Sequence, residues 1–173
     1  MQLIETIDGT PKIVEDRFTR VLPEDDADLS AVELPDGPLI VSLELWRARR
    51  DELKSRDDEL GLWLESDVPL DDVTDEVGHF DLIALDFPHF KDGRSFSKAR
   101  LLREREDYEG RLRAVGDVQY DQLYFMARCG FDGFEPAQTF DINEALEGFK
   151  KFTITYQPAV DEEQPLFRRV ERS

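Results

Sequence analysis

The sequence has little cysteine and no long apolar run. Cys129 is the one cysteine in 173 residues, which excludes an intramolecular disulfide and an all-cysteine zinc or iron–sulfur site. No apolar segment approaches the roughly 20 residues that a transmembrane helix needs, and the amino terminus lacks the pattern of a secretory signal. We therefore expect a cytoplasmic protein that does not interact with membranes.

Motifs for nucleotide binding and nucleophilic catalysis are also absent. The chain contains neither a GxGxxG fingerprint nor a Walker loop. Its two histidines show no spacing from which a serine–histidine–acid or cysteine–histidine arrangement can be inferred. A flavin can bind the edge of an α/β sheet without an obvious motif, so the cofactor is unknown and oxidoreductase activity stays open.

Basic residues are scarce, and they are unevenly placed. The chain has 22 Lys or Arg against 40 Asp or Glu, a net charge of −18. This charge repels phosphate backbones and excludes a general nucleic-acid binder, but it suits either a basic protein partner or a plainly solvated surface. Residues 91–113 are the exception, with eight Lys or Arg against five Asp or Glu.

The order of apolar and charged segments predicts a single α/β domain. Residues 1–37 read as a β-hairpin, turning at Asp8-Gly9, followed by an acidic connector. Residues 38–158 alternate strands with helices, and 159–173 are expected to be a flexible tail. About six mainly parallel strands, covered by helices, would form an open sheet or an incomplete barrel. The predicted strands are 39–46, 60–65, 81–87, 111–117, 133–136 and 152–158; the predicted helices are 47–59, 70–77, 95–107, about 120–129 and 141–152.

An acidic residue stands at the end of each of the first five predicted parallel strands. Ligand sites of parallel sheets lie at this carboxyl edge. Two interpretations stay open: a magnesium-like oxygen site or acid/base pair, and acids that merely cap helices or face solvent. The five acids are Glu44, Glu65, Asp86, Asp117 and Glu135.

The loop after residue 87 and the arginine-rich segment beyond it predict an oxyanion site. Pro88 ends the strand, and a turn at Asp92 and Gly93 precedes a helix that Ser95 or Ser97 can cap. Free N–H groups at the helix start and arginine forks suit sulfate, sulfite or phosphate. In the alternative interpretation, Asp92 and Asp117 pair internally with Arg94 and Arg113. The candidate anion ligands are Arg94, Ser95, Ser97, Arg100 and Arg103; the candidates for proton transfer are Asp86, His89 and Asp117.

Three long segments resemble a known bacterial family. "LDFPHFKDGRSFSKARLLRERE", "GRLRAVGDVQYDQLYFMARCGFDGFE" and "FTITYQ" are similar to the family catalogued as domain of unknown function 934, over about 38–157. Arg111 departs from this pattern, because the family usually has an acid there. The resemblance implies a place in sulfur assimilation, since members are typically encoded beside assimilatory sulfite reductase, and it supplies no mechanism.

The resemblance and the loop together suggest two functions. The first is an accessory protein of assimilatory sulfite reduction, which would hold a small oxyanion and present its acidic surface to sulfite reductase or another basic protein. The alternative is an enzyme, an oxidoreductase among the options, that acts on a small anionic sulfur or phosphate metabolite.

Overall fold

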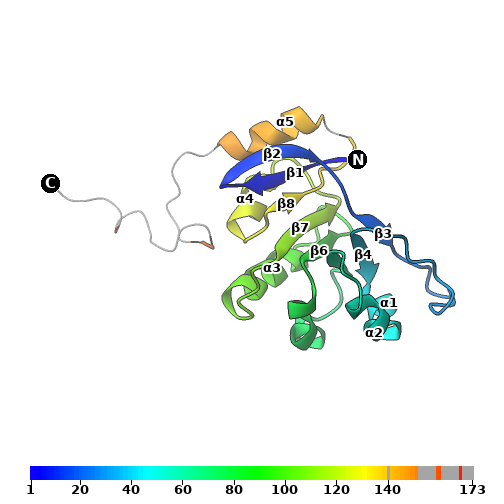
Figure 1. The fold of residues 1–173 in the computed structure, drawn as a ribbon. Helices are drawn as coiled ribbons and strands as arrows, with labels where there is room; N and C mark the ends of the chain where they lie inside the picture. The colour runs from blue at the N-terminus through cyan, green and yellow to red at the C-terminus, as the bar shows by residue number, and fades with distance from the viewer. Residues whose placement is uncertain (140, 152–158, 161–167, 169–173) are drawn as a thin grey trace.

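A computed structural model describes residues 1–139, 141–151, 159–160 and 168 of the chain (Figure 1). Its strands form one eight-stranded sheet in the order β2-β1-β8-β7-β6-β5-β4-β3. The strands are β1 (Gln2–Ile7), β2 (Thr10–Glu15), β3 (Thr19–Val21), β4 (Leu39–Ser42), β5 (Leu60–Leu64), β6 (Leu82–Phe87), β7 (Arg111–Gly116) and β8 (Gly133–Phe134). The helices are α1 (Leu43–Ala48), α2 (Arg50–Lys54), α3 (Arg94–Glu104), α4 (Leu123–Arg128) and α5 (Ile142–Glu147), with 3-10 turns η1 (Leu70–Asp72), η2 (Thr74–His79) and η3 (Gly148–Lys151).

The strand directions confirm the predicted α/β class. Strands β3 to β8 pair in parallel, while β1 and β2 form an antiparallel hairpin at one edge. The predicted number of about six strands is wrong, since the sheet has eight within the described residues. The hairpin joins the same sheet, and β3 is an additional parallel strand where the sequence predicted only a connector.

The predicted strand over 39–46 is shorter than expected, because a helix begins inside it. The Ser42 side chain accepts a hydrogen bond from the Leu45 N–H and caps α1. Glu44 therefore lies in the first turn of a helix and not at a strand end.

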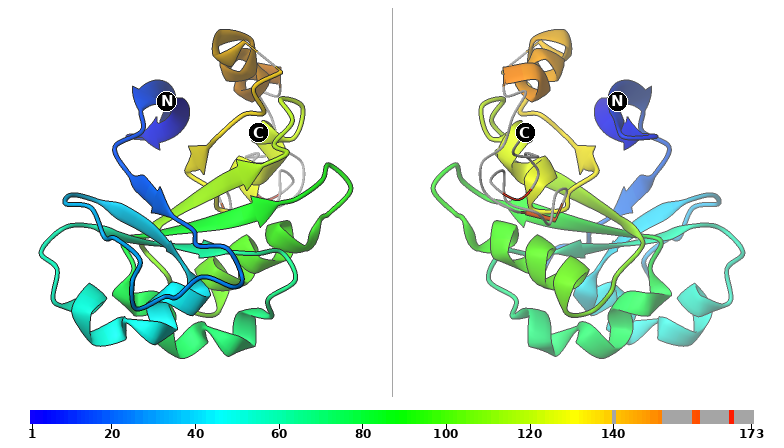
Figure 2. Two further views of the ribbon diagram at one scale, coloured as in Figure 1. Left: turned by 90° about the vertical axis from the view of Figure 1, so that its right-hand side faces the viewer. Right: turned by 90° about the vertical axis from the view of Figure 1, so that its left-hand side faces the viewer.

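The helices cover one face of the sheet, and the other face is open and curled into a half-barrel (Figure 2). Successive side chains along each strand point to opposite faces of the sheet. Leu62 and Leu85 belong to the large core cluster that contains the helix residues. Ile40 and Leu82 belong to a second cluster on the opposite face, which Phe18 covers and which contains no helix residue in the described part of the chain.

The predicted hairpin turn is confirmed, and α5 has a side-chain cap at its start. The turn of the hairpin uses Asp8 and Gly9 with φ of 52° and 73°, the left-handed values that a tight hairpin turn requires. Asp141 caps α5 by accepting the N–H of Asn143, and α5 packs on the hairpin. The predicted strand 152–158 lies outside the described residues, as does most of the predicted tail.

Within the described residues, no helix combines the length and apolar character needed to cross a membrane.

Candidate functional site

Two adjoining hollows open at the carboxyl edge of the parallel strands. The larger, called here the acid hollow, has a volume of about 560 Å³, and the smaller, the side hollow, has about 220 Å³. They share Glu65 and Asp86. The acid hollow is lined by Leu22, Pro23, Asp25, Ser42, Glu44, Trp63, Glu65 and Asp86; the side hollow is lined by Glu65, Ser66, Asp67, Asp86, Pro88 and Arg94.

The register of three neighbouring strands brings these side chains together. Ser42 at the end of β4 lies beside Trp63 of β5, and Trp63 lies beside Ala84 of β6. Asp86 is two residues after Ala84, so it shares the inner face of the curled sheet. Glu65 follows the last residue of β5. The structure thus brings together three of the five acids predicted at strand ends: Glu44, Glu65 and Asp86.

Both shared carboxyl groups have raised pKa values. Desolvation is the main cause of the raised pKa of Asp86, and the nearby Asp92 and Asp67 contribute to it. Desolvation also raises the pKa of Glu65, with further contributions from carboxylates that include Asp67 and Glu44. Burial and the neighbouring carboxylates thus both disfavour the ionised forms of Glu65 and Asp86, which favours a proton or a cation there.

Arg94, the central residue of the predicted anion site, pairs within its own loop. Its guanidinium donates to Asp92, with Nη2 2.6 Å from Oδ2, and to the Ser66 hydroxyl at 2.9 Å. The hydrogen bonds that Asp92 accepts from Arg94 and from the Ser66 hydroxyl, the latter at 2.7 Å, hold its pKa well below the usual range. The Asp92–Arg94 pair of the alternative interpretation is confirmed, whereas the expected Asp117–Arg113 pair is wrong, because Arg113 pairs with Asp16 and Glu5.

The helix that follows the loop begins differently from the prediction. Gly93 occupies the N-cap position of α3, and neither Ser95 nor Ser97 caps it. Ser95 is buried and donates to the Asp86 carbonyl at 2.6 Å, which fixes α3 to the end of β6. Ser97 is exposed.

Lys98 is a residue of this edge that sequence reasoning missed. It is 7% exposed, and its Nζ donates to the Glu65 carbonyl at 2.6 Å. Burial is the main cause of its lowered pKa, and Arg94 contributes. A signal existed in the sequence, because Ser95, Lys98, Ala99 and Leu102 follow helical spacing and form the buried stripe of α3.

The remaining predicted anion ligands lie away from both hollows. Arg100 forms an exposed pair with Glu104 on α3. Arg103 donates to the carbonyls of Tyr108, Gly110 and Gly130 and to the Asp132 carboxylate. The structure therefore does not bring Arg94, Arg100 and Arg103 together around one anion.

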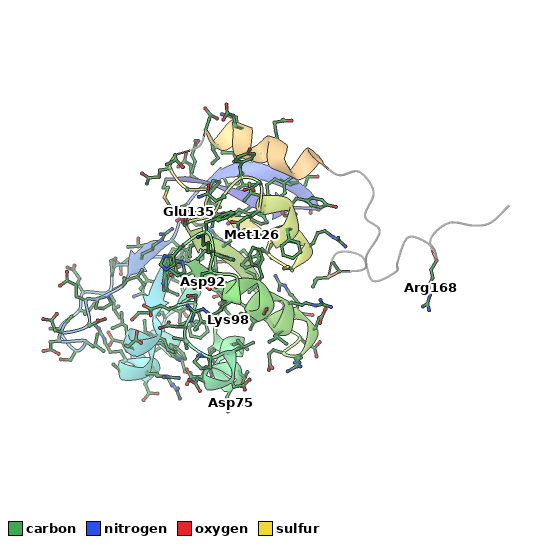
Figure 3. The ribbon with its side chains drawn as sticks, turned by 180° about the vertical axis from the view of Figure 1, so that it is seen from behind. Asp75, Asp92, Lys98, Met126, Glu135 and Arg168 are labelled. Carbon is green, nitrogen blue, oxygen red and sulfur yellow. The ribbon has the colours of Figure 1, made fainter. Side chains whose placement is uncertain are left out.

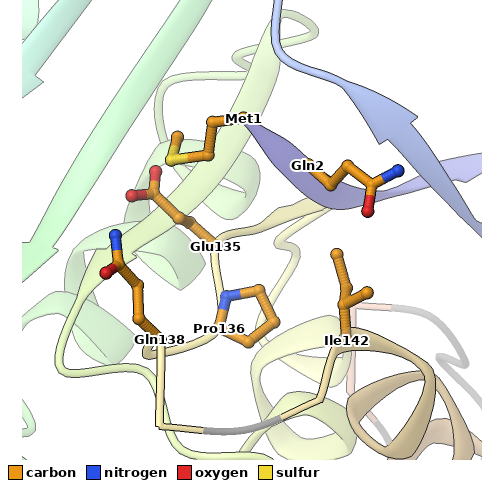
Figure 4. Close-up of a pocket in the computed structure, with 6 residues that line it drawn as sticks. All are labelled: Met1, Gln2, Glu135, Pro136, Gln138 and Ile142. Carbon is orange, nitrogen blue, oxygen red and sulfur yellow. The ribbon is translucent and has the colours of Figure 1, made fainter.

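The other two predicted acids at strand ends have their own partners. Asp117 accepts the N–H of Phe90 at 2.8 Å and the side-chain amide of Gln119. Glu135 pairs with Arg20 and lines a separate hollow of about 210 Å³ (Figure 4). His89 is exposed in the loop after β6. In the described part of the chain, no three His, Cys, Asp or Glu side chains are grouped as a metal site would require.

Gly116 permits the close approach of β7 to Asp86. Its φ is +93°, and a Cβ atom there would lie 2.5 Å from the Phe87 carbonyl oxygen and 2.7 Å from Asp86 Oδ1. Side chains other than hydrogen are therefore excluded at this position.

We predict that Asp86→Asn stabilises the protein. The pKa of Asp86 is raised in the folded state, so its ionised form disfavours folding at neutral pH, and this cost disappears as the pH falls through the raised pKa. An uncharged amide removes the cost, and Tm at pH 7 should rise by about 1–3 °C. The gain should shrink at acidic pH; a fall in Tm at pH 7 would contradict the prediction.

The fold and the hollow define an α/β half-barrel protein with an acid-lined site at its carboxyl edge. The chain belongs to the family described as bacterial protein of unknown function (DUF934), whose profile matches residues 61–167. The match begins later and ends later than the 38–157 expected from the sequence. Searches of curated proteins and of solved structures found no match.

Proposed function

We propose that the protein is an accessory protein of assimilatory sulfite reduction, which binds a basic face of a partner protein at the acid hollow. Sulfite reductase is the first candidate partner. The pathway is what the family resemblance implies. The binding mode draws its support from the site.

The lining of the acid hollow carries this proposal. It includes four carboxyl side chains and no basic one, and its volume accommodates a long basic side chain. A guanidinium or ammonium group from a partner would lower the raised pKa values of Glu65 and Asp86 by supplying the missing positive charge. The Trp63 ring lies beside these carboxylates, and the guanidinium of Arg20 already lies 5.4 Å from its centroid in a cation–π contact.

A small oxyanion has less support as the occupant. Arg94 is the basic residue of the side hollow, and Asp92 and Ser66 already accept its hydrogen bonds. An anion would have to displace Asp92 and to approach Glu65 and Asp86. The internal pairing of Arg94 therefore favours a cationic group over an anion as the occupant of the site.

We predict that the double substitution Glu65→Gln, Asp86→Asn weakens binding to sulfite reductase by about tenfold or more. The substitution removes two charges that lie in the hollow, where solvent screens them less than at an open surface. Affinity is measured by biolayer interferometry at about 50 mM and about 300 mM salt, and the loss should be larger at the lower salt.

Asp71→Asn, Asp75→Asn is the matched control, because it removes the same charge from exposed positions. Figure 3 labels Asp75 at the margin of the molecule, well separated from Asp92, which pairs with Arg94 of the side hollow. The control should bind within about twofold of the wild type. If both variants lose the same affinity, net charge alone explains the effect and the acid hollow has no special role. If the affinity does not depend on salt concentration, the proposal is wrong.

The raised pKa of Asp86 favours one second candidate, an enzyme that uses this carboxyl group for proton transfer. Growth of a deletion strain on sulfate, complemented with each variant, separates the two functions. If Glu65→Gln, Asp86→Asn fails to restore growth yet still binds the reductase, the enzyme is favoured; loss of both favours the accessory protein.

A further inference from the structure

Two phenylalanines are exposed beside the carboxyl edge. Phe90, in the loop after β6, is 50% exposed, and Phe125, on α4, is 56% exposed. We call Phe90, Phe96 and Phe125 the aromatic corner. Large apolar side chains that gather at one place on a surface commonly mark a binding site.

The structure holds these rings in place from below. Phe125 packs on Phe96 with ring centroids 5.1 Å apart, and Phe96 packs on the buried Phe87 at 5.0 Å. The stack runs from the core to the surface, so Phe125 is presented on a fixed base. Rings that are ordered before binding lose little conformational entropy on association.

The loop that carries Phe90 is fixed by polar contacts. The backbone N–H of Phe90 donates to the Asp117 carboxylate at 2.8 Å, and the Phe90 carbonyl accepts from the side-chain amide of Gln122 at 3.5 Å. Gln122 is the N-cap residue of α4, three residues before Phe125. These bonds bring the loop of Phe90 against the start of the helix that carries Phe125.

The aromatic corner adjoins the carboxylates of the two hollows. Pro88, two residues before Phe90, lines the side hollow together with Glu65 and Asp86. One edge of the protein thus offers apolar rings next to the side hollow, whose lining also includes Arg94, and next to the acid hollow that shares Glu65 and Asp86 with it. Interfaces typically combine aromatic anchors with a polar rim, and the partner must complement both.

We propose that the aromatic corner is the apolar half of the surface on which the basic partner docks. The partner would present an apolar recess beside a cluster of Lys or Arg side chains, with the recess receiving Phe90 and Phe125 and the basic residues facing the acid hollow. This inference rests on the proposed function and adds to it a specific apolar contact.

Two synthetic helical peptides test the inference. They have equal length and equal net positive charge, but one places leucines beside its arginines and the other places serines there. The leucine peptide should bind the wild-type protein at least about tenfold more tightly, since it alone can bury the exposed rings. Phe90→Ser and Phe125→Ser should each reduce this advantage, and together they should abolish it, as measured by fluorescence anisotropy.

Ile7→Ser is the matched control. Ile7 is 38% exposed, and it ends a strand antiparallel to β8, so it lies at the opposite edge of the sheet. This variant should keep the full leucine advantage, whereas Glu65→Gln, Asp86→Asn should weaken both peptides alike. Phe90 lies in a loop, so Phe90→Ser alone decides the question if Phe125→Ser does not fold.

The outcomes separate the two proposals. If the two peptides bind equally, or if the leucine peptide keeps its advantage after the loss of both rings, the proposal for the aromatic corner is wrong. The proposal for the acid hollow is unaffected. If neither peptide binds in a salt-sensitive way, the proposed function fails and this inference fails with it.

Discussion

Replacing Arg113 with methionine is expected to lower the free energy of unfolding by about 3–5 kcal/mol. Arg113 is 1% exposed on the inner face of the curled sheet. Its Nη1 donates to Asp16 Oδ1 at 3.0 Å, and Nη2 lies 3.4 Å from Glu5 Oε1. The substitution leaves Asp16, whose side chain is 5% exposed, as a buried charge without its main partner. Urea denaturation followed by circular dichroism measures the loss.

A second substitution tests whether the stranded charge is the cause. Asp16→Asn removes that charge while its side-chain oxygen can still accept the Phe18 N–H. The double variant Arg113→Met, Asp16→Asn should therefore recover part of the lost stability, because an uncharged buried group costs less than an unpaired ion. A double variant less stable than Arg113→Met would show that packing around Phe18 dominates instead.

Much of the fold was predictable because its signals are local. The apolar runs of β5 and β6 are bounded by charged segments, so the alternation of such runs with helical segments indicates a parallel sheet. The Asp8-Gly9 turn and the Asp141 cap act within a few residues of the chain. The acids at strand ends could be placed at one edge, which is why Glu65 and Asp86 were found.

The unpredicted parts depend on contacts between distant segments. The three residues of β3 have no periodicity, and they become a strand because they pair with β4. Asp117 and Glu135 follow strands as predicted, but Phe90, Gln119 and Arg20 engage them. The curl of the sheet likewise places Arg113 beside Asp16, 97 residues away, and not beside the predicted Asp117.

The arginines show the same limit of sequence reasoning. A run rich in Arg indicates positive charge, but it does not say whether the charge faces solvent or the backbone. Arg94 finds Asp92 within its own turn, a short-range pairing that the sequence could suggest. The partners of Arg103 include Gly130 and Asp132, which reach it only because α3 packs beside the turn after α4.

Arg103→Met is expected to lower the free energy of unfolding by about 2–4 kcal/mol, although Arg103 was predicted to bind an anion. The substitution removes the donors to three backbone carbonyls and the guanidinium that pairs with Asp132 at 3.0 Å. Arg103→Lys keeps the charge but not the planar fork, so it should recover only part of the stability. Thermal and urea denaturation measure both variants.

The pH dependence of Arg103→Met distinguishes this structural role from an anion site. Burial already raises the pKa of Asp132 above its ordinary value, and the charge of Arg103 opposes that rise. Without Arg103, ionised Asp132 disfavours folding more strongly at neutral pH, and the penalty fades as the pH falls through the raised pKa. The variant should therefore lose more stability at pH 7 than in mildly acidic buffer. If Arg103→Met is as stable as the wild type but no longer binds sulfite or sulfate, Arg103 is an anion ligand, as the sequence predicted. The reason is that removal of a group that only binds a ligand leaves the fold intact.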